Sequence, residues 1–341
     1  MIWLLALACG GPPRPLVAPP DPAAAVAEAP PEAAAPPPPP EPPPPPPPPP
    51  PVVAPDGTVA VACAEAPAGM SCVPGGLTVR GSDEPHPCDQ QRWADPLSPN
   101  YKPAQPIWVQ TVYLDQTEVT YAAYKACVAA GKCDAGGPAY NDFNRPTQPI
   151  TGVSWFKAVK FCKAQGKHLP TEAEWEKGAR GEAGEPFPWG TDAPTCERAV
   201  VQDEKGRSCG VPKAEPHPEK GRPLEVGSRA AGRYGLFDMA GNVEEWVADW
   251  YVRFDQCKTE ECGGVDPKGP CGGSATACRD LTYKVVKGGS WYWNGSHTSG
   301  FHRRMWYPSN SPMHHFGFRC AASPAEAAAI AAAVPPAPTA P

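Results

Sequence analysis

The spacing of apolar residues predicts a first helix in the stretch TYAAYKACVAAGKC. Tyr124, Cys127 and Val128 fall on one face of a helix with 3.6 residues per turn. Thr120 is a suitable N-cap, and Gly131 can end the helix in a left-handed conformation. This stretch therefore predicts an amphipathic helix packed on a core.

Two further helices are predicted soon afterwards. SWFKAVKFCKAQGK places Trp155, Val159 and Cys162 on one stripe, which predicts that Cys162 is buried. In LPTEAEWEKGARG, Thr171 and Glu174 have the spacing of a capping box. We therefore interpret Glu174 and its neighbouring acids as helix residues and not as general acids.

Strand patterns are short and far apart. Apolar, strand-like pieces occur at 77–80 and 107–115, and LTYKVVKGGSWYW alternates apolar and polar residues, as strands do. Beyond residue 182 the chain is rich in Gly, Pro, Asp and Asn and otherwise has few periodic segments. The pattern predicts an α+β fold made largely of ordered loops, which disulfides and tryptophan packing must stabilise.

Proline divides the chain. Of its 52 prolines, 24 precede residue 56, and a continuous run of ten has no backbone donors, so we expect polyproline II there. The predicted parts are a signal peptide with a lipobox at 1–9, a disordered Pro/Ala-rich linker at 10–55, a folded domain at 56–322 and a low-complexity tail at 323–341. Within the tail, Pro324 to Val334 could form a frayed helix.

The first residues, MIWLLALACGG, resemble a bacterial lipobox, in which Cys9 would carry the lipid. The alternative is a plain secretion signal. The chain has a net charge of −6 and no basic clusters, which gives no electrostatic case for nucleic acid or an anionic lipid surface as a partner. We expect a monomeric bacterial envelope protein, in the periplasm or on the outer membrane, that meets the membrane only through its lipid anchor.

The chain has 14 cysteines and no C-x2-C pair, which favours disulfides and an oxidising compartment over metal sites. Short spacings predict the pairs Cys127–Cys133 and Cys196–Cys209. Lipidation of Cys9 would leave an odd number. The sequence leaves two sets of pairings open: Cys63, Cys72 and Cys88, and the four loop cysteines Cys257, Cys262, Cys271 and Cys278.

Four segments resemble the formylglycine-generating enzyme, or sulfatase-modifying factor, family. They are PITGVSWFKAVKFCKAQGKHLPTEAEWEKGARG, FPWG, YGLFDMAGNVEEWVADWY, and VVKGGSWYW followed by HRRMWYP and FGFRCA, in the family's order. The resemblance covers about residues 70–322 and implies a single C-type-lectin-like α+β domain. It also implies a structural disulfide between Cys162 and Cys320.

The segment DMAGNVEEW is similar to a calcium loop of that family. The resemblance implies a structural calcium ion held by Asp238, by the carbonyl groups of Gly241 and Val243, and by Glu245. Hard oxygen donors suit calcium, whereas the alternative for these acids is a solvated turn.

The resemblance also indicates where catalysis would occur. The family's oxidases follow a Gly-Gly-Ser turn with two cysteines, five residues apart, that bind copper(I) and convert a substrate cysteine into formylglycine. Here Ser290 matches the turn, but Trp293 and Thr298 occupy the two cysteine positions. Because copper(I) needs thiolate ligands, we expect no copper and no such oxidation.

A ligand groove is our leading interpretation of the region after this turn. Flat aromatic rings beside polar groups suit a peptide or a glycan. The groove residues would be Trp291, Trp293, Asn294, His297, His302, Arg303, Arg304 and Trp306. The alternatives are plain core, since alternate residues of a strand face opposite sides, and pairing of the arginines with a buried acid such as Glu244.

Two other functions remain open at this point. The cluster of His297, His302, His314 and His315 could hold iron or zinc in an oxidoreductase of the same family. A purely structural envelope protein would bind neither ligand nor metal beyond calcium.

Overall fold

The computed structural model describes residues 51–84, 100–138, 140–212, 221–273, 276–308 and 313–333. The predicted signal peptide with Cys9, most of the predicted linker, and Cys88 lie outside these residues. Within the described ranges, no helix is both long enough and apolar enough to span a membrane.

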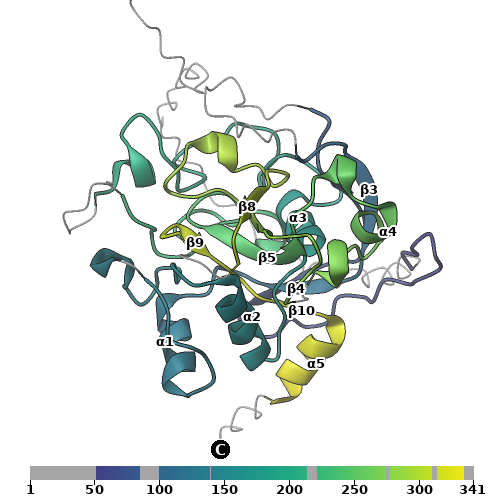
Figure 1. Ribbon diagram of the computed structural model, residues 1–341, viewed down its shortest axis with the longest axis horizontal. Helices are drawn as coiled ribbons and strands as arrows, with labels where there is room; N and C mark the ends of the chain where they lie inside the picture. Colours follow the sequence, from purple (N-terminus) through teal and green to yellow (C-terminus); the bar gives the residue numbers. More distant parts are fainter. Residues whose placement is uncertain are drawn as a thin grey trace, which may run out of the picture. The chain divides into compact units, whose positions relative to one another are not determined.

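Three small sheets and five α-helices form the folded part (Figure 1). One sheet has the order β1 (Met70–Val73), β4 (Val112–Asp115), β10 (Ala321–Ala322). The second has the order β2 (Gly76–Arg80), β3 (Gln105–Val109), β6 (Gly264–Val265). The third has the order β8 (Arg304–Trp306), β7 (Lys284–Lys287), β5 (Glu244–Trp250), β9 (Phe316–Gly317). The helices are α1 (Tyr121–Ala129), α2 (Trp155–Ala164), α3 (Glu172–Arg180), α4 (Thr259–Cys262) and α5 (Pro324–Ala333).

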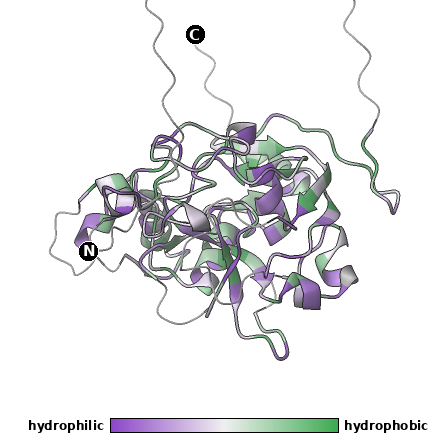
Figure 2. Cartoon of the chain, turned by 90° about the horizontal axis from the view of Figure 1, so that it is seen from above, coloured by the Kyte–Doolittle hydropathy of each residue, from purple (hydrophilic) through white to green (hydrophobic). Residues whose placement is uncertain are grey.

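The three predicted helices are confirmed, together with the expected caps. The Thr120 hydroxyl accepts a hydrogen bond from the backbone N–H of Ala123 at the start of α1. At the start of α3, Thr171 and Glu174 form both hydrogen bonds of a capping box. Figure 2 shows hydrophilic and hydrophobic residues interspersed along the helical ribbons. Local capping and apolar spacing identified these three helices correctly.

Two strand predictions need correction. The piece 107–115 is two strands, because Gln110 and Thr111 turn the chain from one sheet to another between β3 and β4. Of the residues 281–293, only Lys284–Lys287 form a strand, β7, and all four of its side chains are buried. After it, Gly288 and Gly289 adopt positive φ angles of 91° and 68°, and the following residues form turns. Trp291, Tyr292 and Trp293 therefore do not alternate across a sheet.

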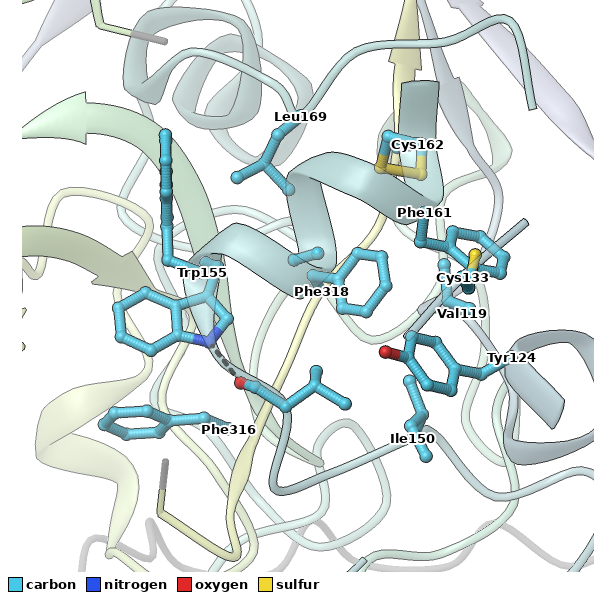
Figure 3. Close-up of a cluster of buried hydrophobic side chains, with 14 of the residues drawn as sticks. Val119, Tyr124, Cys133, Ile150, Trp155, Phe161, Cys162, Leu169, Phe316 and Phe318 are labelled. Carbon is cyan, nitrogen blue, oxygen red and sulfur yellow. Dashed lines mark hydrogen bonds between the residues drawn. A yellow bond between two sulfur atoms is a disulfide. The ribbon is translucent and has the colours of Figure 1, made fainter. Parts of the chain in front are cut away.

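The largest core cluster joins α1 and α2 to the strand β9 (Figure 3). Tyr124, Phe161 and Phe318 pack ring against ring with centroids 5.5–6.4 Å apart. The Cys162–Cys320 disulfide borders this cluster, and both of its cysteines are fully buried. The helix stripe predicted from the sequence thus faces the core.

The described residues contain six disulfides, which settle the open pairings except that of Cys88. They are Cys63–Cys72, Cys127–Cys133, Cys162–Cys320, Cys196–Cys209, Cys257–Cys262 and Cys271–Cys278. All twelve cysteines among the described residues are therefore oxidised. So many disulfides indicate an extracellular or otherwise oxidising compartment.

The helix that the sequence suggested at Pro324 to Val334, within the predicted low-complexity tail, is present. This helix is α5, which contacts β4 and β10. Ala327 is buried, and Ile330 packs on a cluster that includes Met70 and Tyr113. The folded part therefore continues to the end of α5, because this alanine-rich helix has an apolar surface to cover.

Candidate functional site

The Gly-Gly-Ser turn after β7 brings two parts of the site segment into close contact. A Cβ atom on Gly289 would lie 2.6 Å from the carbonyl oxygen of His297, so only glycine fits. The turn buries Ser290 completely, and its hydroxyl has no hydrogen-bond partner in the described structure. The turn therefore fixes where the next side chains point.

Trp293 and Thr298 stand where the family resemblance implies two cysteines, and neither side chain offers a thiolate for copper(I). Trp293 is half-buried, and its ring stacks on His297 with centroids 5.1 Å apart. Thr298 is fully buried, and its hydroxyl donates to the carbonyl oxygen of Gly295 over 2.8 Å. Because every described cysteine is in a disulfide, the described residues offer no thiolate for copper(I).

Aromatic and histidine rings gather around these positions, all half-buried except that of the fully buried His315. We define the aromatic–histidine cluster as Tyr292, Trp293, His297, His302, His314 and His315. The Tyr292 ring stacks on His315 at 4.9 Å, and the Arg207 guanidinium lies 3.5 Å from the Tyr292 ring centroid. Nδ1 of His297 lies 3.2 Å from Nε2 of His302. The cluster combines flat apolar faces with hydrogen-bonding nitrogens.

Six of the eight predicted groove residues remain partly accessible, namely Trp293, Asn294, His297, His302, Arg304 and Trp306. The other two do not. Trp291 is 1 % exposed and packs with Phe143, Val200, Leu224 and Val243, so it belongs to the core. Arg303 is also 1 % exposed, and its Nε and Nη2 donate to the two carboxylate oxygens of Glu172 over 2.6 and 2.8 Å.

Arg304 forms the structural ion pair that the sequence left as an alternative. Its Nη1 lies 3.0 Å from Oε2 of the buried Glu244, and its guanidinium also faces the ring of Trp293. Burial, together with the nearby charge of Arg304, holds the pKa of His315 well below its usual range. His315 is therefore a neutral imidazole, 3.4 Å from Glu244 through Nε2.

The glutamates of α3 stabilise the fold, as their helix positions suggested. Glu172 is buried with Arg303 and with Lys287, whose Nζ lies 3.2 Å away. Burial opposes its ionisation, but Arg303 and Lys287 outweigh burial and lower the pKa of Glu172 to about 2. Glu176 pairs with Lys287 and with Arg180. Glu172, Glu176, Arg180, Lys287 and Arg303 are thus connected in one ionic network.

The described residues show no site for iron or zinc. No group of three His, Cys, Asp or Glu side chains among them is arranged to hold a metal ion. The rings of the adjacent His314 and His315 are nearly perpendicular, at 86°. No observation therefore favours the histidine-bound redox metal.

The loop at 238–245 contains a buried acidic cluster that includes one residue the sequence did not point out. Glu245 accepts from Arg319 through both oxygens over 2.7 Å, and from Trp175 Nε1 over 2.9 Å. Oδ2 of Asp238 accepts from the backbone N–H of Gly227 over 2.6 Å. The additional member is Glu118, whose Oε2 is buried without a hydrogen-bond partner. Glu118 lies two residues before the helix cap Thr120, and no local pattern there points to its acidic neighbours.

Electrostatics indicates that this acidic cluster lacks positive charge. Burial, Asp238 and Glu245 together raise the pKa of Glu118 well above its usual range, and burial also raises that of Asp238. Arg319 is the cation whose charge acts on Glu118, Asp238 and Glu245. Glu245 is already fully paired, whereas Oε2 of Glu118 has no hydrogen-bond partner, and calcium binding stays a prediction.

Comparison with known proteins places this arrangement in a family. Residues 56–324 match the model of the sulfatase-modifying factor enzyme 1-like domain. The chain is 35% identical to the formylglycine-generating enzyme of Thermomonospora curvata over 191 residues, which cover 55% of this chain and 60% of the relative. It is 31% identical to the bovine inactive C-alpha-formylglycine-generating enzyme 2 over 178 residues, 51% of this chain and 50% of that protein.

Solved structures support the fold. PvdO from Pseudomonas aeruginosa superposes with a TM-score of 0.55 at 22% identity, covering 74% of this chain and 93% of that structure. Treponema denticola variable protein 1 gives a TM-score of 0.53 at 19% identity, covering 75% and 95%. The alignments span only about half to 60% of the length of the two curated relatives described. With the family model matching most of the chain, this protein belongs to the formylglycine-generating enzyme-like, sulfatase-modifying factor family and has its α+β fold.

Proposed function

We propose that this protein is a non-catalytic member of its family that binds a peptide or a glycan at the aromatic–histidine cluster. The observation that carries the proposal is the pair of side chains at the degenerate cysteine positions. Trp293 presents a stacked ring, and Thr298 uses its hydroxyl to close a turn. Neither side chain can bind copper(I), but the ring can bind an extended ligand.

The surroundings of Trp293 support ligand binding. Asn294, His297 and His302 are partly accessible and carry donors and acceptors beside the ring. Arg304 adds a positive charge whose position is fixed by Glu244. A few fixed polar groups around an aromatic face are typical of sites that orient a peptide or a sugar. A related protein, the bovine one, also bears the description inactive.

We place the domain outside the cytoplasm, on a lipid anchor at Cys9 and a proline-rich stalk. Six disulfides support an oxidising compartment. The lipobox-like start and the proline run support the anchor and the stalk. Globomycin, which blocks lipoprotein signal cleavage, should make the unprocessed precursor accumulate; unchanged processing would contradict the anchor.

The proposal includes one structural calcium ion. Glu118 and Asp238 would hold it together with the carbonyl groups of Gly241 and Val243, and the ion would supply the positive charge that Arg319 alone does not. Its role would be to stabilise the loop that leads into β5.

The binding site is tested by screening the purified chain on peptide and glycan arrays. We expect at least one class of ligand to bind and Trp293→Ala to weaken that binding by about tenfold or more. Phe156→Ala is a matched control, because Phe156 is an exposed aromatic residue outside the cluster. Absence of any ligand, or equal binding by the Trp293 variant, would contradict the proposal.

A further inference from the structure

A cavity of about 450 Å³ lies beside α5, at a place separate from the aromatic–histidine cluster. Residues of α2, α3 and α5 line it together with the β3–β4 turn and the loop after β6, and none of the cluster residues does. Its apolar lining includes Val109, Val159, Leu169 and Ala248. This volume is in the range of cavities that hold small ligands or single side chains.

The wall formed by the loop after β6 is held in place. Strand β6 pairs with β3, where Val265 lies opposite Trp108. The next residue, Asp266, donates from its backbone N–H to the carbonyl oxygen of Trp108 and accepts from the Gln110 N–H through Oδ1 over 2.6 Å. Disulfides Cys257–Cys262 and Cys271–Cys278 close short loops on either side. Such a wall loses little entropy when a ligand binds.

The opposite wall is held by a histidine between two acids. His168 places Nδ1 2.8 Å from Oε2 of Glu326 and Nε2 3.3 Å from Oε2 of Glu174. Burial disfavours its cationic form, but the two acids outweigh burial and raise the pKa of His168 to about 9. His168 is therefore charged at neutral pH. Glu174 and Glu326 each contact its ring through Oε2 and not through Oε1.

Several carboxylate oxygens at the cavity wall have no hydrogen-bond donor, although the buried Lys177 and the exposed Lys268 lower the pKa of Asp266. In the described structure, Oε1 of Glu174, Oε1 of Glu326 and Oδ2 of Asp266 accept no hydrogen bond. Burial and the charge of Glu174 raise the pKa of Asp266, so the two acids act on each other. Lys163 and Lys268 also line the cavity, but both are exposed, so water screens their charges.

We propose that this cavity binds a primary ammonium group on an apolar stem, the chemistry of a lysine side chain or of a short alkylamine. The ammonium would lie between Asp266 and Glu174 and take their free oxygens as acceptors. The stem would lie along Leu169 and Ala248. An ammonium has three donors and no acceptor, which matches a set of unpaired carboxylate oxygens.

The test uses calorimetry on the full chain with three probes: pentylamine, the peptide acetyl-Gly-Lys-Gly-amide, and the same peptide with norleucine in place of lysine. We expect saturable binding of an amine probe and none of the norleucine peptide. Binding of pentylamine alone would identify a free amine as the source, and binding of the peptide alone a protein side chain. No binding of either amine would overturn the proposal.

Variants localise the binding. Asp266→Asn should weaken it by about tenfold or more, since a charge-assisted hydrogen bond is lost. Asparagine tolerates the positive φ of 45° at this position and can still accept from Gln110, so we expect the variant to fold. Glu326→Gln serves as a second variant on the more exposed α5. Asp134→Asn, at an exposed acid outside the cavity, is the matched control. Unchanged affinity in both cavity variants would refute the site.

Discussion

The turn at 288–298 and the loop at 238–245 lie at the ends of two paired strands, β7 and β5, and the family resemblance implies that they keep different features. In the turn, the glycines and Ser290 remain while Trp293 and Thr298 occupy the positions where a copper oxidase needs thiolates. In the loop, Asp238 and Glu245 remain, and Glu118 joins them. We infer from this difference that the glycine turn is needed for the scaffold, whereas the side chains at the two cysteine positions are not.

The largest expected effect concerns the ionic network that supports the turn. Arg303→Met would remove both hydrogen bonds that Arg303 donates to the buried Glu172 and leave Lys287 as its ion-pair partner, with the charge of Arg80 nearby. We expect the free energy of unfolding to fall by about 3–5 kcal/mol, as when one partner of a buried pair is removed. Urea unfolding measures it. A loss below about 1 kcal/mol would show that the turn does not depend on this network.

The next test restores the missing thiolates. The double variant Trp293→Cys/Thr298→Cys should bind about one equivalent of copper(I) under ascorbate, because two nearby thiolates suit that ion. Competition with a chromogenic chelator measures it. The double alanine variant is the control. Failure of the cysteine variant to bind copper would mean that the turn no longer has the geometry of its relatives.

Removal of calcium by a chelator tests the loop at 238–245. A chelator should lower the melting temperature by several degrees, since about 1 kcal/mol corresponds to roughly 2–4 °C for a domain of this size. Asp238→Asn should remove most of that dependence. An equal melting temperature with and without chelator would contradict calcium binding. Protons alone would then neutralise the carboxylates of Glu118 and Asp238.

The smallest expected effect concerns His168, which pairs with Glu326 of α5 and belongs to neither of the two regions. Because the folded pKa of His168 is raised to about 9, its ion pairs stabilise the fold fully below pH 6.5, and this contribution is lost as pH rises through 9. His168→Gln should cost about 1 kcal/mol or less at pH 6, and less still at pH 10. Urea unfolding at both values measures the difference. An equal cost at both would contradict the assigned charge.

The sequence predicted the helices because their caps and apolar stripes are local. It left the burial of Trp291 and Arg303 open as an alternative to the groove, since the glycine turn ends the strand alternation and the partner of Arg303, Glu172, is 131 residues away. Glu118 was missed for the same reason, as its acidic neighbours come from a distant loop. The pairing of Cys162 with Cys320 came from the family resemblance, because spacing does not determine a bridge of that length.

The central claim is that this scaffold does not oxidise cysteine. The most direct measurement incubates the purified chain with copper(I), oxygen and a peptide that carries the sulfatase cysteine motif, and follows the peptide by mass spectrometry. We predict that the mass of the peptide does not shift to that of the formylglycine product. Turnover to the formylglycine peptide that is lost on Trp293→Ala would contradict the account.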